Sequence, residues 1–184
     1  MTEFDYWVGH TVSIEGGLSL DPDDNGNWTG GKKGSGLLKG TKFGISAASF
    51  PDEDIANLTE ERAKAIYKTG YWDRCKCDSM PSRIAFLTFD CAVNCGVGTA
   101  GKVLQRVLNN IIRDRLKVDG AIGPKTLAAL NRALAHCTEE ELLGALLLER
   151  MKEHADIVGR HPDKLKWLRG WLLRLYRLKE LVEV

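Results

Sequence analysis

The sequence predicts a mainly α-helical domain with a small β-hairpin lobe near its N-terminus and an amphipathic helix at its C-terminus. Beyond residue 59, apolar side chains recur at spacings of three and four, as on one face of a helix. The stretch 18–46 is instead rich in Gly, Asp, Asn and turn-forming pairs. The chain has 184 residues and is 43% hydrophobic, which is enough to build one compact domain with a real core.

The first predicted helix covers residues 4–14 and runs into Glu15-Gly16-Gly17. Two glycines favour a helix end because glycine adopts the left-handed cap conformation without strain. Glu15 would then lie near helix carbonyls whose partial negative charge raises a carboxyl pKa. A raised pKa suits a general acid, so Glu15 is a candidate catalytic residue. The alternative is an ordinary surface glutamate beside a helix cap.

The stretch 18–46 is long for an unstructured loop and predicts a separate lobe with short strands. Residues 21–26 match the first half of a calcium loop, but Lys32 stands where the bidentate glutamate is required, so calcium is not expected. If the lobe folds back over the first helix, Asp24 and Thr41 would face the candidate acid. Glycoside hydrolysis needs such a second polar group. Alternatively, Asp24 only caps a turn through its own backbone.

The rest of the chain is helical in pattern. Asp90 and Asn94, spaced four apart in an apolar helix, are interpreted as structural residues that hydrogen-bond loop backbone or each other. The predicted helices are residues 60–67 capped by Thr59, the buried segment 81–97, the amphipathic stripe 103–112, residues 126–135 opened by Pro124, a helix opened by the capping box of Thr138 and Glu141 and ending before Pro162, and a last helix from about residue 163.

The five cysteines predict reduced thiols and no metal site. Their number is odd, and the N-terminus has neither the basic nor the apolar segment of an export signal. Cys75, Cys77, Cys91 and Cys95 could form a four-cysteine zinc site, but only one pair has the usual spacing and it lies in the buried helix. We therefore expect no metal and no organic cofactor. No segment is apolar for long enough to span a membrane, so accumulation in the cytoplasm is expected.

Taken together, these motifs resemble the glycoside hydrolase family 108 muramidases, which are lysozyme-like endolysins of phages and prophages. The N-terminal signature is Glu15-Gly16-Gly17, Asp21-Pro22-x-Asp24 and Thr41-Lys42-Phe43-Gly44-Ile45-Ser46. Further matching segments are Tyr71-Trp72-Asp73-Arg74, Phe89-Asp90-x-Ala92-Val93-Asn94-x-Gly96, Ala100-x-x-Val103-Leu104-Gln105-Arg106, the peptidoglycan-binding block Val118-Asp119-Gly120-Ala121-Ile122-Gly123-Pro124-Lys125-Thr126-Leu127, and Trp167-Leu168-x-Gly170-Trp171-Leu172-x-Arg174.

The resemblance implies an α+β lysozyme-like fold, with a catalytic region in residues 1–98 and a helical, peptidoglycan-binding region in residues 99–184, packed as one globular unit. It implies that Glu15 is the general acid. By analogy with other phage lysozymes, Asp24 and Thr41 would support it, although Thr29 competes with Thr41 for the matched threonine. Tyr71 is a further candidate for the cleft or, alternatively, a core aromatic.

The last helix predicts a second surface for interaction. Between Lys164 and Lys179 there are six basic residues and no acidic one. A helical arrangement places Trp167 and Trp171 with four leucines on one face, and basic residues including Arg174 largely on the other. Such helices bind anionic membranes or lipopolysaccharide, but the apolar face can equally pack on the domain. The net charge of +1 gives no reason to expect a nucleic-acid partner.

The sequence thus predicts a monomeric endolysin that hydrolyses the β-1,4 bond between N-acetylmuramic acid and N-acetylglucosamine in peptidoglycan and lyses the host. It would wait in the host cytoplasm and reach the periplasm and cell wall through a holin-type pore. The alternative is a non-enzymatic protein that binds the wall or permeabilises membranes through its basic C-terminal helix.

Overall fold

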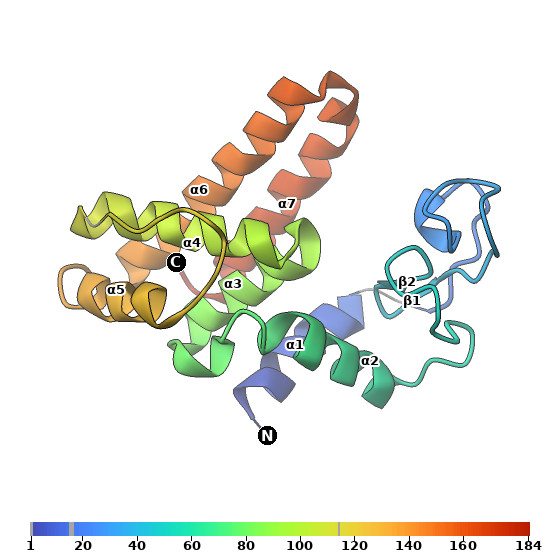
Figure 1. Cartoon of the computed structure of the whole chain (residues 1–184), viewed down its shortest axis with the longest axis horizontal. Coiled ribbons are helices and arrows are strands. Elements are labelled where there is room, and N and C mark those ends of the chain that lie inside the picture. The colour runs from blue at the N-terminus through green and yellow to red at the C-terminus, as the bar shows by residue number, and fades with distance from the viewer. Residues whose placement is uncertain (1, 15–16, 114) are drawn as a thin grey trace. The chain divides into compact units, whose positions relative to one another are not determined.

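The computed structural model describes residues 2–14, 17–113 and 115–184 (Figure 1). The chain divides into two compact units, Met1–Gly70 and Tyr71–Val184. The described residues are mostly helical, and their one sheet is a two-stranded antiparallel hairpin. The predicted fold class, a mainly α protein with a small β lobe near the N-terminus, is therefore confirmed.

The described residues of the first unit form two α-helices, α1 (Glu3–Ile14) and α2 (Glu60–Tyr67). Both were predicted, and the Thr59 cap is confirmed because its side chain accepts a hydrogen bond from the backbone N–H of Arg62 at 3.2 Å. The buried apolar residues of this unit come from α1, from the hairpin, from α2 and from the segment before α2. They are Phe4, Trp7, Val8, Ile45, Ala47, Ile55, Leu58, Ala63, Ile66 and Tyr67.

The lobe is organised around a hairpin of β1 (Thr41–Lys42) and β2 (Ile45–Ser46), in which Thr41 pairs with Ser46. Phe43 and Gly44 form the turn, with φ values of 51° and 74°. The short strands predicted for the lobe are thus only two residues long, and Phe43 and Gly44 connect them. A two-residue hairpin turn of type I′ needs positive φ at both central positions, which is unfavourable for Phe43. Tyr67 stabilises this turn by donating its hydroxyl proton to the Phe43 carbonyl at 2.9 Å.

The second unit holds the remaining α-helices of the described residues, and the helix Val97–Ile112 packs against Ser82–Cys95, Pro124–Leu134 and Glu139–Arg160. The predicted helix over residues 81–97 is interrupted at Gly96, whose φ of 88° suits glycine, so Val97 begins the next helix. The capping box of Thr138 and Glu141 is confirmed. The helices are α3 (Ser82–Cys95), α4 (Val97–Ile112), α5 (Pro124–Leu134), α6 (Glu139–Arg160) and α7 (Leu165–Leu181).

A buried ion network joins α3, α6 and α7. Asp90 is 1% exposed and accepts from Arg150 Nη1 at 2.5 Å and from Arg174 Nη2 at 2.6 Å. Burial disfavours the charged carboxylate, but the two guanidinium groups outweigh burial and hold the pKa of Asp90 below its usual value. The predicted contact with Asn94 is confirmed, since Asn94 Nδ2 donates to the Asp90 carbonyl at 2.8 Å. The two arginine partners were not predicted.

The helix α7 packs on α6, and the two run side by side in Figure 1. Leu175 and Leu178 are buried, as predicted for the apolar face. One detail of the predicted faces is wrong, because Arg174 points inward to Asp90. Trp167, on the predicted apolar face, is 53% exposed. Within the described part of the chain, no helix combines the length and the apolar character that spanning a bilayer requires.

Candidate active site

Glu15, the predicted general acid, lies outside the described residues, as does Gly16. The structure does describe the lobe that follows them, residues 17–46. The buried polar residue Asn27, which is 0% exposed, holds the lobe together through its side-chain hydrogen bonds. This role was not predicted from the sequence. Asn27 Nδ2 donates to the Asp21 carbonyl at 2.9 Å, and its Oδ1 accepts from the Thr41 hydroxyl at 2.7 Å. Asn27 therefore connects the acidic turn to the first strand.

Asp24 lies on the surface of this lobe, next to Asn27 in the turn. Its carbonyl accepts from the Asn27 N–H at 3.2 Å, and its Oδ1 accepts from the Gly26 N–H at 2.8 Å. Asp24 thereby caps the short 3-10 helix η1 (Asn25–Asn27), so the predicted turn role is observed. One carboxylate oxygen is fixed by this bond while the side chain stays accessible to solvent. Such a group can still accept a hydrogen bond from a water molecule or a sugar hydroxyl.

Thr41 meets the same buried asparagine from the other side. Its backbone is fixed by a pair of hydrogen bonds with Ser19, at 2.8 and 2.9 Å, and by the β1–β2 pairing. Its hydroxyl proton is donated to Asn27, and the hydroxyl oxygen remains an acceptor. Thr41 is thus linked to Asn27 through the side chains, and Asp24 is linked to Asn27 through the backbone of the turn.

The competing threonine, Thr29, has a different place in the lobe. Its Oγ1 accepts from the Leu37 N–H at 2.9 Å, and its own N–H donates to the Leu37 carbonyl at 2.9 Å. A Cβ atom at Gly36 would lie 2.2 Å from Thr29 Oγ1, so the close approach requires glycine there. The Thr29 side chain therefore closes the loop between Trp28 and Leu38, which form an isolated bridge.

In the acidic turn, residues 21–26, polar side chains hydrogen-bond or pair with other groups of the lobe. Asp21 Oδ1 accepts from the Asp23 N–H at 2.9 Å, Asn25 Oδ1 accepts from the Lys33 N–H at 2.9 Å, and Asp23 forms an ion pair with Lys33. Across residues 2–14, 17–113 and 115–184, no three His, Cys, Asp or Glu side chains are grouped so that they could hold a metal ion.

Tyr71 belongs to the second unit, in the short π-helical turn η2 (Lys68–Trp72). The side chain is half-buried, and burial raises the pKa of its phenol. The neighbouring Trp72 is a core residue: its Nε1 donates to Asp78 Oδ1 at 2.6 Å, and its ring packs edge-on against Phe89 at 5.6 Å. A role for Tyr71 in the cleft stays a prediction.

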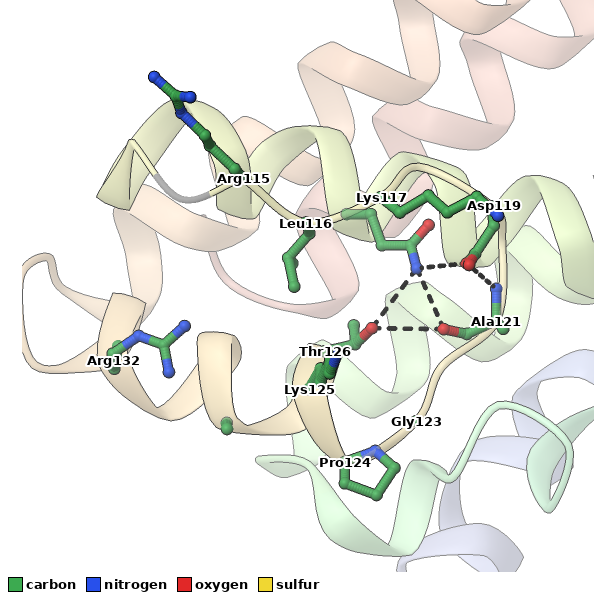
Figure 2. A pocket seen from close by; sticks show the side chains of 12 residues that line it. Arg115, Leu116, Lys117, Asp119, Ala121, Gly123, Pro124, Lys125, Thr126 and Arg132 are labelled. Carbon is green, nitrogen blue, oxygen red and sulfur yellow. Dashed lines mark hydrogen bonds between the residues drawn. The ribbon is translucent and has the colours of Figure 1, made fainter.

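A second site lies in the segment between α4 and α5, where a pocket of about 800 Å³ opens beside Gln105 (Figure 2). Gln105 is 2% exposed; its Nε2 donates to Asp119 Oδ1 and to the Ala121 carbonyl, both at 3.0 Å, and its Oε1 accepts from the Gly120 N–H at 2.9 Å. A Cβ atom at Gly101 would lie 2.1 Å from the Gly120 carbonyl oxygen. Two glycines and one amide thus hold this loop against α4.

The mainly helical fold with a small two-stranded sheet is that of a lysozyme-like α+β protein, and comparison with known proteins agrees. Residues 8–96 match the family model described as Glycosyl hydrolase 108, and residues 99–176 match the model described as Predicted Peptidoglycan domain. Residues 8–96 are thus a glycosyl hydrolase 108 region, which confirms the resemblance drawn from the sequence. Together the two matches support a glycoside hydrolase that acts on peptidoglycan.

Among solved structures, the chain is similar to one described as "Structure of Brucella abortus SagA". The sequences are 25% identical, the TM-score is 0.75, and the match covers 97% of this chain and 92% of the other. No curated protein matches the chain. The family boundary, between residues 96 and 99, falls inside the second compact unit, so the glycosyl hydrolase 108 region includes residues of both units.

Proposed function

We propose that the protein is a muramidase that hydrolyses the β-1,4 bond between N-acetylmuramic acid and N-acetylglucosamine. The carrying observation is that the glycosyl hydrolase 108 match, residues 8–96, contains Glu15 and the lobe in which Asp24 and Thr41 both contact Asn27. A carboxylic acid followed by a lobe with a second, solvent-facing carboxylate has the groups that glycosidic hydrolysis requires.

In this proposal Glu15 is the general acid and protonates the glycosidic oxygen as the bond breaks. Asp24 fits the supporting role better than Thr41 does. Its exposed carboxylate retains acceptor capacity to orient water or stabilise positive charge on the sugar ring. Thr41 donates its proton to Asn27, so its part is to position the lobe and accept a hydrogen bond through its oxygen.

Mass spectrometry of digested peptidoglycan tests the proposal directly. Each cleavage should add one water and leave a reducing N-acetylmuramic acid at the new end. A new reducing N-acetylglucosamine, an anhydro sugar formed without water, or cleavage within the peptide would each overturn the proposed bond. Wall from which the stem peptides have been removed serves as the control for peptidase activity.

We further propose that the enzyme acts as a monomeric prophage endolysin. It would accumulate in the host cytoplasm and reach the wall through a membrane hole made by a holin-type protein, with lysis and antibacterial action as the result. Expression in a bacterial host, with and without a co-expressed holin, tests this order of events. Lysis that depends on the holin is the expected result, and lysis at the same rate without it would contradict the proposal.

A second candidate activity is binding of α7 to anionic membranes or lipopolysaccharide. It is favoured by apolar side chains that remain exposed on the docked helix: Leu165, Trp167, Leu173 and Tyr176. The basic residues Lys166 and Arg169 are exposed on the same helix. An apolar surface bordered by positive charge is suited to a negatively charged lipid interface.

The full chain should bind vesicles with anionic headgroups and not neutral ones, and Trp167→Ala should weaken this binding severalfold. Leu127→Ala, which shortens an apolar side chain of α5, is the control. A chain that is inert on anionic vesicles, or a Trp167 variant that binds as the wild type does, would rule out the membrane role.

A further inference from the structure

The pocket between α4 and α5 has a basic rim. Its floor carries one negative charge, the carboxylate of Asp119, which is the one acid among the described lining residues and accepts hydrogen bonds from Gln105 and from the Ala121 N–H. Around this floor stand Arg115, Lys117, Lys125 and Arg132. Figure 2 shows the loop that carries Arg115 and Lys117 on one side of the hollow and α5, with Lys125 and Arg132, on the other.

The rim residues differ from the floor in exposure and in partners. All four basic side chains are exposed, whereas Gln105, Gly120 and Thr126 are buried. Lys117 lies near enough to Asp119 to help lower the pKa of that carboxyl, an effect that is secondary to the hydrogen bonds from Ala121 and Gln105. Lys125 makes no ion pair within the described residues. The floor therefore fixes the loop, and the exposed rim brings four positive charges beside the single carboxylate of Asp119, which favours a ligand with negative charge.

The pocket is also stable in shape before any ligand binds. The Gln105 side-chain amide donates hydrogen bonds to Asp119 and to the Ala121 carbonyl. Thr126 Oγ1 donates to the same carbonyl at 3.3 Å. Gly120 has a φ of 85°, and an added Cβ there would lie 2.5 Å from the Gly98 carbonyl oxygen, so other residues are excluded. A fixed cavity with cations on two sides binds an anion without a large ordering cost.

We propose that this pocket binds the stem peptide of peptidoglycan through the carboxylates of that peptide. The pocket lies wholly within the region matched by the Predicted Peptidoglycan domain, residues 99–176. The glycan strand offers mainly hydroxyl and acetamido groups, whereas the stem peptide carries several carboxylates, which lysine and arginine recognise. Leu116 and Pro124 supply apolar surface for the aliphatic part of the peptide. The proposal rests on peptidoglycan as the substrate and is independent of which bond is cut.

Calorimetric titration of the full chain with the free stem tetrapeptide tests this site without any hydrolysis. The same peptide with its carboxylates amidated and inorganic phosphate are the comparison probes. The peptide should bind, amidation should weaken binding at least tenfold, and phosphate should bind more weakly than the peptide. Loss of one charge-assisted hydrogen bond in Lys125→Gln should weaken peptide binding about tenfold, and Arg132→Gln by a similar factor.

Lys152→Gln is the matched control, since Lys152 is an exposed lysine of α6 that does not line the pocket. It should bind the peptide within twofold of the wild type. The proposal is overturned if the wild type does not bind the peptide, if the amidated peptide binds equally well, if phosphate binds as tightly as the peptide, or if the Lys125→Gln and Arg132→Gln double variant keeps full affinity. Retained unfolding temperatures verify that each variant is folded. Failure of the muramidase assay would leave these binding results unaffected.

Discussion

The lobe of residues 17–46 and the helical unit Tyr71–Val184 are stabilised by different interactions. In the lobe, backbone pairs and the side chains around Asn27 hold short, mostly exposed segments with few buried apolar residues. In the helical unit, a large apolar core surrounds one ion network centred on Asp90. The candidate supporting residues, Asp24 and Thr41, thus lie in the part with little hydrophobic stabilisation, where polar contacts set the geometry.

The largest effect on stability should follow removal of the central charge of the helical unit. Asp90→Asn leaves Arg150 buried without its carboxylate, which costs about 3–5 kcal/mol of unfolding free energy. Urea denaturation measures this loss. Asp156→Asn, a change at an exposed residue of α6, should cost less than about 0.5 kcal/mol. If the two variants were equally stable, the network would not stabilise this unit.

The corresponding change in the lobe should affect activity more than global stability. Asn27→Ala leaves the Thr41 hydroxyl and the Asp21 carbonyl without their partner, at about 1–3 kcal/mol of local free energy. We expect wall-clearing activity to fall at least tenfold, as judged by turbidity assays. Hydrogen exchange should accelerate in residues 17–46 and stay unchanged in α3–α6. Asn57→Ala, at an exposed asparagine before α2, is the control. Equal acceleration in both regions would show that they unfold together.

Acid should destabilise the helical unit through His154. Burial lowers the pKa of His154 to about 4, aided by the nearby Arg150 charge. The unfolded chain takes up this proton near pH 6.5, before the folded chain does, so stability is retained at neutral pH and lost as the pH falls from 6.5 towards 4. The loss between pH 7 and pH 5 should be about 1–2 kcal/mol. Because the His154 ring stacks on Trp171 at 4.9 Å, His154→Phe keeps a ring there and should flatten this dependence in thermal melts. An unchanged slope would contradict the assignment to His154.

The two threonines of the lobe should give the smallest effects and separate its two roles. Thr41→Val and Thr29→Val each remove a hydrogen bond, at about 1 kcal/mol. Only Thr41→Val should also lower the turnover rate, because Thr41 contacts Asn27 while Thr29 closes the loop at Leu37. Steady-state kinetics beside thermal melts distinguish them. A larger loss of turnover in Thr29→Val would reassign the matched threonine.

Much of the helical layout was predictable because its signals are local. The Thr59 cap, the capping box at Thr138 and the opening Pro124 each act within one helical turn, and the structure confirms the helices that they begin. The hairpin was predicted less well, because a turn at Phe43 with positive φ is set by its bond to Tyr67, 24 residues away.

The polar centres could not be predicted from local pattern. Asp90 was recognised as a buried acid, but its partners Arg150 and Arg174 lie 60 and 84 residues further along the chain. Apolar periodicity shows which helix face is buried and does not show which cation is buried with it. In α6, for example, Met151 is 43% exposed while the neighbouring Arg150 is buried. The local sequence around Asn27 indicates only a turn and does not show that its side chain is buried.

The central claim is that Glu15 is the general acid of a muramidase, and the rate of Glu15→Gln on purified peptidoglycan tests it most directly. The amide keeps the size of the side chain and cannot donate the catalytic proton, so the rate should fall at least about 100-fold with an unchanged unfolding temperature. Glu3→Gln, at an exposed glutamate of α1, should retain the wild-type rate. A folded Glu15→Gln variant with near wild-type activity would contradict the account.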